Sequence, residues 1–254
     1  MPNWVTNILT INADEKMVEK ILSEVKSENS EFDFNLILPM PLGLENTTAP
    51  ARIVSDEDYA EDSSRGITQA MYDARIKEYG FSDWYNWRLH HWDTKWNADE
   101  VYINDNEITF NTAWSNPKAL LVALSKKYPN VEFQIKFSDE DFGYNVGSYT
   151  LLNGEPSEID FPDGGTDEAY MMAMEIHSDT DYYFENFLYE IEEDELDEFQ
   201  KTIIRLSYKE KNSVNDDMPL VVLNEFLSLA LAEENYEYAD EVKKTIEAKE
   251  SIEN

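Results

Sequence analysis

The chain has 254 residues, of which 42% are hydrophobic and 13% aromatic, so it is long enough to bury a core and is not a disordered chain. It contains no cysteine, which excludes disulfides and thiolate metal sites and favours a reducing cytoplasm. Its net charge of −34 disfavours direct nucleic-acid binding over most of the surface and favours basic partners.

The N-terminal residues carry no basic segment, and no apolar run approaches the roughly 18 residues that a membrane helix needs. We therefore expect a cytoplasmic protein with neither a signal peptide nor a membrane span.

The first third of the chain alternates patterns that are typical of strands and helices. Residues 4–11 are rich in β-branched side chains, which predicts a strand, and apolar residues within 17–25 recur at helical spacing. Residues 32–39 predict a short buried strand or extended run that stops at a proline. A helix over 67–79 is expected to end at Gly80.

The middle of the chain predicts further strands. Residues 101–103 and 107–114 read as a strand pair, and residues 131–137 alternate strictly, as a half-buried strand does. Between them, Ser115 is expected to cap a helix. The dipeptide at 153–154, Asn-Gly, predicts a tight turn between two last strands.

This order predicts an α+β fold, with a ferredoxin-like antiparallel sheet and helices on one face over residues 1–155. The helix at about 67–79 is an insertion. Residues 156–200 are predicted to form an acidic extension, since residues 151–200 hold 17 acidic residues and no Lys or Arg. A helix is expected over 182–199, and residues 201–254 are expected to contain a C-terminal αα-hairpin.

Four of the six tryptophans fall between Trp84 and Trp96, with cationic residues among them. Such a cluster builds either a core or a stacking surface. We favour the core, because a ferredoxin-like layer needs large side chains to close its sheet against the inserted helix. The alternative is a site for a planar small ligand or single-stranded nucleic acid, with cations near phosphate. Its candidate ligand-binding residues are Trp87, Arg88, His91, Trp92 and Lys95.

Several separated motifs resemble a phage- and plasmid-borne family with a YubB-type ferredoxin-like domain: residues 1–7, Pro39-Met40-Pro41, the tryptophan-rich segment and residues 110–117. The resemblance covers about residues 1–155. It implies a mobile-element origin and a ferredoxin-like fold, and it implies no established activity and no catalytic residues. Between Trp92 and Thr94 a glycine is expected, and this chain has Asp93 there, which affects the conformation of the turn.

Residues 229–247 are similar to the helical hairpin at the ends of the UvrB and UvrC excision proteins, which implies docking to another protein. Tyr236 and Tyr238 are the candidate partner-binding residues of this hairpin. In the acidic extension, closely spaced carboxylates can imitate a DNA phosphate path and occupy a nucleic-acid-binding protein. The candidates there are Glu190, Glu192, Glu193, Asp194, Glu195, Asp197 and Glu198.

No phosphate-binding glycine loop, dinucleotide fingerprint or nucleophile elbow occurs, so we predict no catalytic residue, no cofactor and no metal site. The leading hypothesis is a non-enzymatic accessory protein of a phage or plasmid. It would act in the host cytoplasm and bind a host or defence protein through the acidic surface or the hairpin. The alternatives are the ligand or single-strand binder and a metal-assisted enzyme, for which His177, Asp179 and Asp181 offer potential ligands. The oligomeric state stays open.

Overall fold

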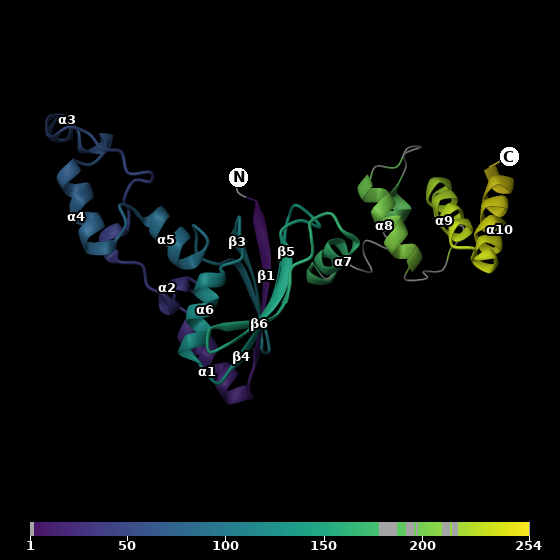
Figure 1. Cartoon of the computed structure of the whole chain (residues 1–254), viewed down its shortest axis with the longest axis horizontal. Helices are drawn as coiled ribbons and strands as arrows, with labels where there is room; N and C mark the ends of the chain where they lie inside the picture. The colour runs from purple at the N-terminus through teal and green to yellow at the C-terminus, as the bar shows by residue number, and fades with distance from the viewer. Residues whose placement is uncertain are drawn as a thin grey trace. The chain divides into compact units, whose positions relative to one another are not determined.

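The computed structural model describes residues 3–177, 187–191, 196, 198–209, 214 and 218–253. Internal contacts divide the chain into two compact units, Met1–Gly164 and Gly165–Asn254 (Figure 1). The first unit contains the sheet and the second is helical. The separate acidic extension over residues 156–200 remains a prediction.

The first unit is built on a six-stranded sheet in the order β2-β3-β1-β4-β5-β6, in which every neighbouring pair is antiparallel. The inner order β2-β3-β1-β4, with one helix after β1 and another after β3, is the ferredoxin-like arrangement, so the predicted α+β fold is confirmed. The strands are β1 (Trp4–Asn12), β2 (Asp99–Asn104), β3 (Glu107–Ala113), β4 (Glu132–Asp139), β5 (Val146–Leu152) and β6 (Glu155–Asp160).

Helices α1 (Glu15–Val25) and α6 (Lys118–Lys127) lie on the same side of the sheet (Figure 1). The alternation in β1 explains this: Val5, Asn7, Leu9 and Ile11 are buried, while Thr6, Ile8 and Thr10, which alternate with them, are only partly buried. Successive side chains of a strand point to opposite faces, so one face of β1 joins the core and the other does not. The turn at Asn153-Gly154 has two positive φ angles, as a tight hairpin between β5 and β6 requires.

A buried polar network crosses the core of the first unit. The side-chain amide of Asn7 donates to Thr112 Oγ1 at 2.8 Å, and Asn116 Nδ2 donates to Asn7 Oδ1 at 2.9 Å. The hydroxyl of Tyr149 donates to Asn116 Oδ1 at 2.7 Å, and burial raises the pKa of this phenol. Because these buried groups are paired with one another, the network stabilises the fold and offers no unpaired reactive group.

Between α1 and β2 the chain forms a helical insertion: α2 (Phe34–Ile37), η1 (Leu42–Leu44), α3 (Asp56–Glu61), η2 (Ser63–Arg65), α4 (Gln69–Tyr79) and α5 (Trp84–Trp92). The strand expected over residues 32–39 is therefore wrong. Asp33 caps a short helix instead, because its carboxylate accepts from the backbone N–H of Asn35. The helix expected over 67–79 is α4, and Gly80 ends it in the left-handed conformation.

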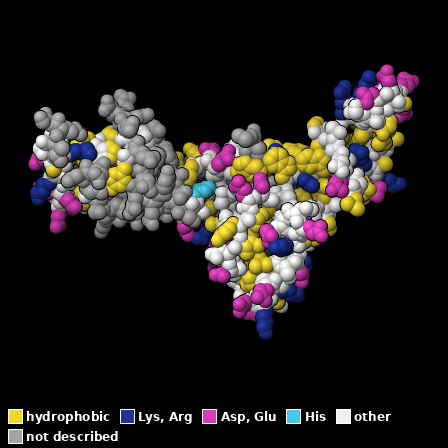
Figure 2. All heavy atoms as spheres, turned by 180° about the vertical axis from the view of Figure 1, so that it is seen from behind, with side chains coloured by type: hydrophobic (Ala, Val, Ile, Leu, Met, Phe, Trp, Pro, Cys, Tyr) yellow, Lys and Arg dark blue, Asp and Glu magenta, His cyan; other side chains and the backbone are white. Residues whose placement is uncertain are grey.

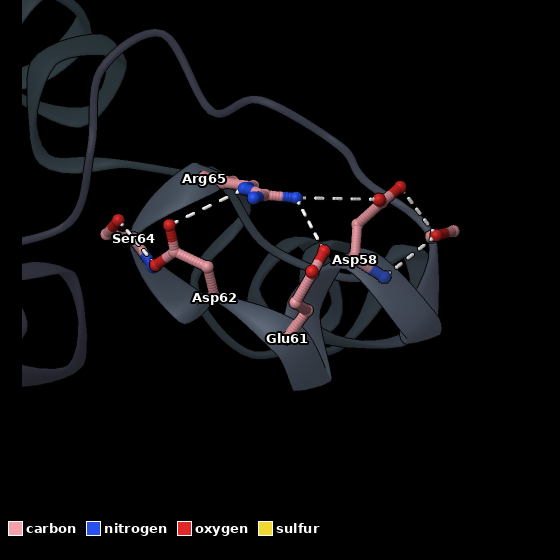
Figure 3. Close-up of polar contacts among 6 residues, drawn as sticks. Asp58, Glu61, Asp62, Ser64 and Arg65 are labelled. Carbon is pink, nitrogen blue, oxygen red and sulfur yellow. Dashed lines mark hydrogen bonds and ion pairs between the residues drawn. The ribbon is translucent and has the colours of Figure 1, made fainter.

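Arg65 ties α3 to η2 on the surface of this insertion (Figure 3). Its guanidinium lies 2.9 Å from a carboxylate oxygen of Glu61, 3.5 Å from Asp62 and 3.9 Å from Asp58. All four side chains are exposed, so water and salt screen these ion pairs and each adds little stability.

The second unit contains α7 (Asp167–Ile176), η4 (Phe187–Glu190), α8 (Glu198–Lys209), α9 (Leu220–Ala232) and α10 (Tyr236–Glu253). Helices α9 and α10 are antiparallel neighbours joined at residues 233–235, so the predicted C-terminal hairpin is confirmed. The continuous helix expected over 182–199 is wrong, because η4 is a short 3-10 turn and Ile191 after it is not helical.

Candidate functional site

Helix α5 carries three of the tryptophans, and residues four apart on it lie against one another. The rings of Trp87 and His91 stack with centroids 4.1 Å apart, and His91 Nδ1 lies 2.8 Å from the carbonyl oxygen of Trp87. Elsewhere on the helix, the Arg88 guanidinium lies 5.2 Å from the ring centroid of Trp84 and 4.8 Å from that of Trp92. The i, i+4 spacing of a helix produces both contacts.

Two of the candidate ligand-binding residues, Trp87 and Trp92, lie in the core. The Trp92 ring is 0% exposed, and it meets Phe34 edge to face with centroids 5.6 Å apart. Its indole N–H donates to the carbonyl oxygen of Leu38 at 2.9 Å, which satisfies the one polar atom of the ring. These two rings therefore present no open face to a ligand.

A cavity of about 320 Å³ lies beside α5, and we call it the Arg88 cavity. Its walls come from the loop before α3, from α5 and from the segment after α5. The lining residues are Met40, Glu45, Asn46, Trp84, Arg88 and Trp96. Two indole rings, a guanidinium, a carboxylate, an amide and a thioether thus surround a space of the size that small-ligand sites have.

Hydrogen bonds hold the loop wall of the Arg88 cavity against α5. The backbone N–H of Trp84 donates to Thr47 Oγ1 at 3.0 Å, and this hydroxyl donates to the carbonyl oxygen of Leu44 at 2.7 Å. Between them, Asn46 has a φ of +60°, a left-handed conformation that asparagine tolerates better than most residues. The loop therefore has a defined shape where it lines the cavity.

Arg88 is the cation of the Arg88 cavity, and its side chain is only partly exposed. Burial lowers the pKa of the guanidinium, and the charges of Glu45 and Asp33 oppose that shift. Within the described residues its one hydrogen bond goes to the carbonyl oxygen of Lys95 at 3.3 Å, and its buried Nε has no partner. A guanidinium carries five N–H donors, so Arg88 has donors to spare for a ligand.

Lys95 lies between two partly exposed rings next to the same cavity. Its Nζ is 3.9 Å from the ring centroid of Trp96 and 3.7 Å from that of Trp114, both within cation–π range. Trp114 has a φ of +72°, and its backbone N–H donates to the carbonyl oxygen of Asn3. Figure 2 shows one face of the molecule, on which hydrophobic side chains gather over α5 and the adjacent end of the sheet. Trp96, which is 37% exposed, belongs both to this stack and to the cavity wall.

Asp93 explains why the turn after α5 needs no glycine. Its φ of +60° is left-handed, and its carboxylate accepts from the backbone N–H of Ala119 at 2.6 Å, in the first turn of α6. Ser115, expected to cap that helix, makes no cap contact, and its hydroxyl donates to the carbonyl oxygen of Asp93. The prediction for Ser115 is therefore wrong, because Asp93, 26 positions upstream of Ala119, satisfies the helix N-terminus.

The structure describes only part of the predicted partner-binding set. Tyr236 is 66% exposed at the start of α10. Tyr238 is half-buried, with its ring centroid 5.5 Å from Tyr208, and burial raises its pKa to about 12. Of the acidic candidates, Glu192, Glu193, Asp194, Glu195 and Asp197 lie outside the described residues, as do the side chains of Glu190 and Glu198.

Among the described residues, no group of three His, Cys, Asp or Glu side chains is arranged to hold a metal ion. Asp179 and Asp181, the potential ligands near His177, lie outside those residues. Within the same part of the chain, no helix is long and apolar enough to cross a membrane.

Of the six residues that line the Arg88 cavity, only Arg88 was among the candidate ligand-binding residues, and Lys95 lies beside the cavity. Met40, Glu45 and Asn46 lie in an irregular segment with no periodic pattern, so nothing in their spacing marked them. Trp84 and Trp96 stood at the ends of the tryptophan-rich segment, and only the packing of α5 separates them from the two core rings.

Residues 91–185 match the family model described as the ferredoxin-like domain in Api92-like protein. The match agrees with the predicted ferredoxin-like fold; residues 1–90 lie outside it, and it says nothing of a phage or plasmid origin. A crystal structure of a protein api92 from Yersinia pseudotuberculosis is similar over 65% of this chain and 100% of that chain, with 12% identity and a TM-score of 0.38. A likeness that low carries no argument about function. No curated protein matches the chain.

Proposed function

We propose that the first unit is a binding module that takes a planar ligand with a hydrogen-bond acceptor into the Arg88 cavity. The observation that carries the proposal is the combination of two indole rings and a guanidinium with spare donors around one cavity. A ring stacks on indole, and an acceptor on that ring satisfies Arg88, whose desolvated charge has no carboxylate within ion-pair distance among the described residues. A nucleobase and an aromatic carboxylate both have this chemistry.

Tryptophan fluorescence tests the proposal directly, because all six tryptophans belong to the first unit. A panel of nucleosides, nucleotides, short oligonucleotides and aromatic carboxylates is titrated, and at least one is expected to quench the signal saturably. Arg88→Met should weaken that ligand about tenfold to hundredfold, the value of a hydrogen bond to a charged group. Lys77→Met, a loss of charge on exposed α4, is the matched control. The proposal fails if no compound quenches saturably or if both variants behave alike.

A second candidate function is protein docking through the C-terminal hairpin. Two large side chains at its turn, Leu231 and Tyr236, are more than half exposed, which is consistent with a contact surface. Under this proposal the protein is an accessory factor of a phage or plasmid that binds a host protein, with the acidic residues of 151–200 as a further contact.

A pull-down from host lysate tests the docking function with three baits: the full chain, Leu231→Asp with Tyr236→Asp, and a control with Glu234→Gln and Glu237→Gln on the same turn. The first and third should retain the same partner, and the second should lose it. Retention by all three baits would rule out the hairpin. A captured partner whose binding is unchanged from low to high salt would rule out the acidic surface.

A further inference from the structure

A second hollow of the first unit lies between helix α1 and the turn that joins β2 to β3, and we call it the α1 groove. Its volume is about 410 Å³. It is lined by Ala13, Glu15, Val18, Glu19, Leu22, Asp105 and Asn106. It shares no lining residue with the Arg88 cavity and is independent of that site.

Hydrogen bonds fix the two walls of the α1 groove. The backbone N–H of Ile11 donates to the carbonyl oxygen of Asn106 at 2.9 Å, and Asn106 Nδ2 donates to the carbonyl oxygen of Ile11 at 3.0 Å. This pair anchors the turn to the end of β1. On the other side, the carboxylate of Asp14 accepts from the backbone N–H of Met17 and caps α1. The groove is therefore a preformed feature of the fold.

The α1 groove combines apolar side chains with uncompensated negative charge. Val18 is buried, while Ala13 and Leu22 are partly exposed at the edge of the core. The carboxylates of Glu15, Glu19 and Asp105 are exposed, and no ion pair or hydrogen bond engages them in the described part of the chain. The nearby Lys20 pairs with a residue outside the groove, since its Nζ lies 3.9 Å from Oε1 of Glu24.

We propose that the α1 groove docks a basic peptide segment of a partner protein. One apolar side chain of the segment enters beside Val18 and Leu22, and flanking Lys or Arg side chains pair with Glu15, Glu19 and Asp105. Charge complementarity supports this occupant, because a cation gains from three unpaired carboxylates and an acidic partner would be repelled. The net charge of −34 also steers basic segments toward the protein.

Fluorescence anisotropy with labelled synthetic peptides tests the proposal. The probe alternates lysine and leucine, and a matched peptide alternates lysine and serine. The variant Glu15→Gln, Glu19→Gln, Asp105→Asn should weaken the lysine–leucine peptide about tenfold, as expected for the loss of three exposed ion pairs. Neutralising three exposed carboxylates elsewhere, Glu28→Gln, Glu57→Gln and Glu140→Gln, makes the same change in net charge and should weaken it less than about threefold.

Leu22→Ser tests the apolar part of the α1 groove. It should weaken the lysine–leucine peptide about threefold to tenfold and leave the lysine–serine peptide unchanged, since only the first peptide buries an apolar side chain there. Equal losses in the two triple variants would show attraction to net charge alone and overturn the proposal. Equal binding of the two peptides, or no binding of the first, would overturn it as well.

Discussion

The tryptophans of α5 and its flanks divide into two sets with opposite surroundings. Trp87 and Trp92 are buried in the core of the first unit, whereas Trp84 and Trp96 line the Arg88 cavity. The residue type is the same, and the four lie within thirteen positions of the chain. Each turn of a helix directs side chains to different sides, so tryptophans that are neighbours in sequence have different surroundings. The tryptophan-rich segment therefore contributes two rings to the core and two rings to a cavity wall.

The largest effect on stability is expected from replacing one of the two buried tryptophans. Trp92→Ala should lower the free energy of unfolding of the first unit by about 3–5 kcal/mol, because it leaves a cavity and an unpaired carbonyl at Leu38. Trp96→Ala, at a partly exposed ring, should cost about 1 kcal/mol or less. Denaturant unfolding followed by tryptophan fluorescence measures both. Similar losses in the two variants would contradict the division.

A smaller effect is expected at the residue that ends α5. Asp93→Ala should cost about 2–3 kcal/mol, since it loses the cap of α6 and keeps a left-handed backbone that alanine disfavours. Asp93→Gly loses only the cap and should cost about 1 kcal/mol, and Asp93→Asn less. Urea midpoints of the three variants supply the test. A glycine variant as unstable as the alanine variant would show that backbone strain contributes nothing.

His90 and His91 are neighbours in sequence that also differ in burial. His91 stacks on Trp87 and contacts its carbonyl oxygen, while His90 is exposed. His91→Ala should therefore cost about 1 kcal/mol, and His90→Ala should lie within about 0.5 kcal/mol of the parent protein. Thermal unfolding of both variants, at one and the same pH, measures the difference. A larger loss of stability for His90→Ala than for His91→Ala would contradict the stacking of His91 on Trp87.

In the C-terminal hairpin, the burial of Tyr238 can be tested through the pKa of its phenol. Burial, with Glu241 and Tyr208 nearby, raises the pKa of Tyr238 to about 12. A phenol that ionises later in the folded protein stabilises it fully below its ordinary pKa of about 10, and the contribution disappears as pH rises toward 12. The difference between the 295 nm titrations of the parent protein and Tyr238→Phe should show one phenol with a midpoint near 12. A midpoint near 10 would mean that Tyr238 is exposed.

Local patterns predicted much of the fold because they depend on neighbours in sequence. The alternation in residues 131–137 became β4, the Asn153-Gly154 turn joined β5 to β6, and the apolar spacing beyond residue 218 became α9 and α10. The helix over 67–79 is α4. The strand expected over 32–39 failed because a short apolar run fits a strand or a helix, and the Asp33 cap decided for helix.

The candidate site was predicted only in part. Arg88 and Lys95 stood out as cations among aromatic residues, which is a local feature, and both lie at the Arg88 cavity or beside it. Glu45 and Asn46 gave no signal, because they reach the cavity from a loop about 40 positions upstream. Asp93 was recognised as a departure from an expected glycine, and its capping contact with α6 appeared only in the structure.

By itself, the sequence determined the class of fold, the C-terminal hairpin and the strong negative charge, since periodicity and composition are properties of the chain read locally. Tertiary structure decided that β1 lies between β3 and β4 and pairs with both, although these strands follow it by about 100 and about 130 residues. It also decided which tryptophans became core and which became cavity wall. Both outcomes depend on contacts between segments that are distant in the sequence. The sequence pattern shows which face of an element is apolar, and only the folded structure shows which surface buries that face.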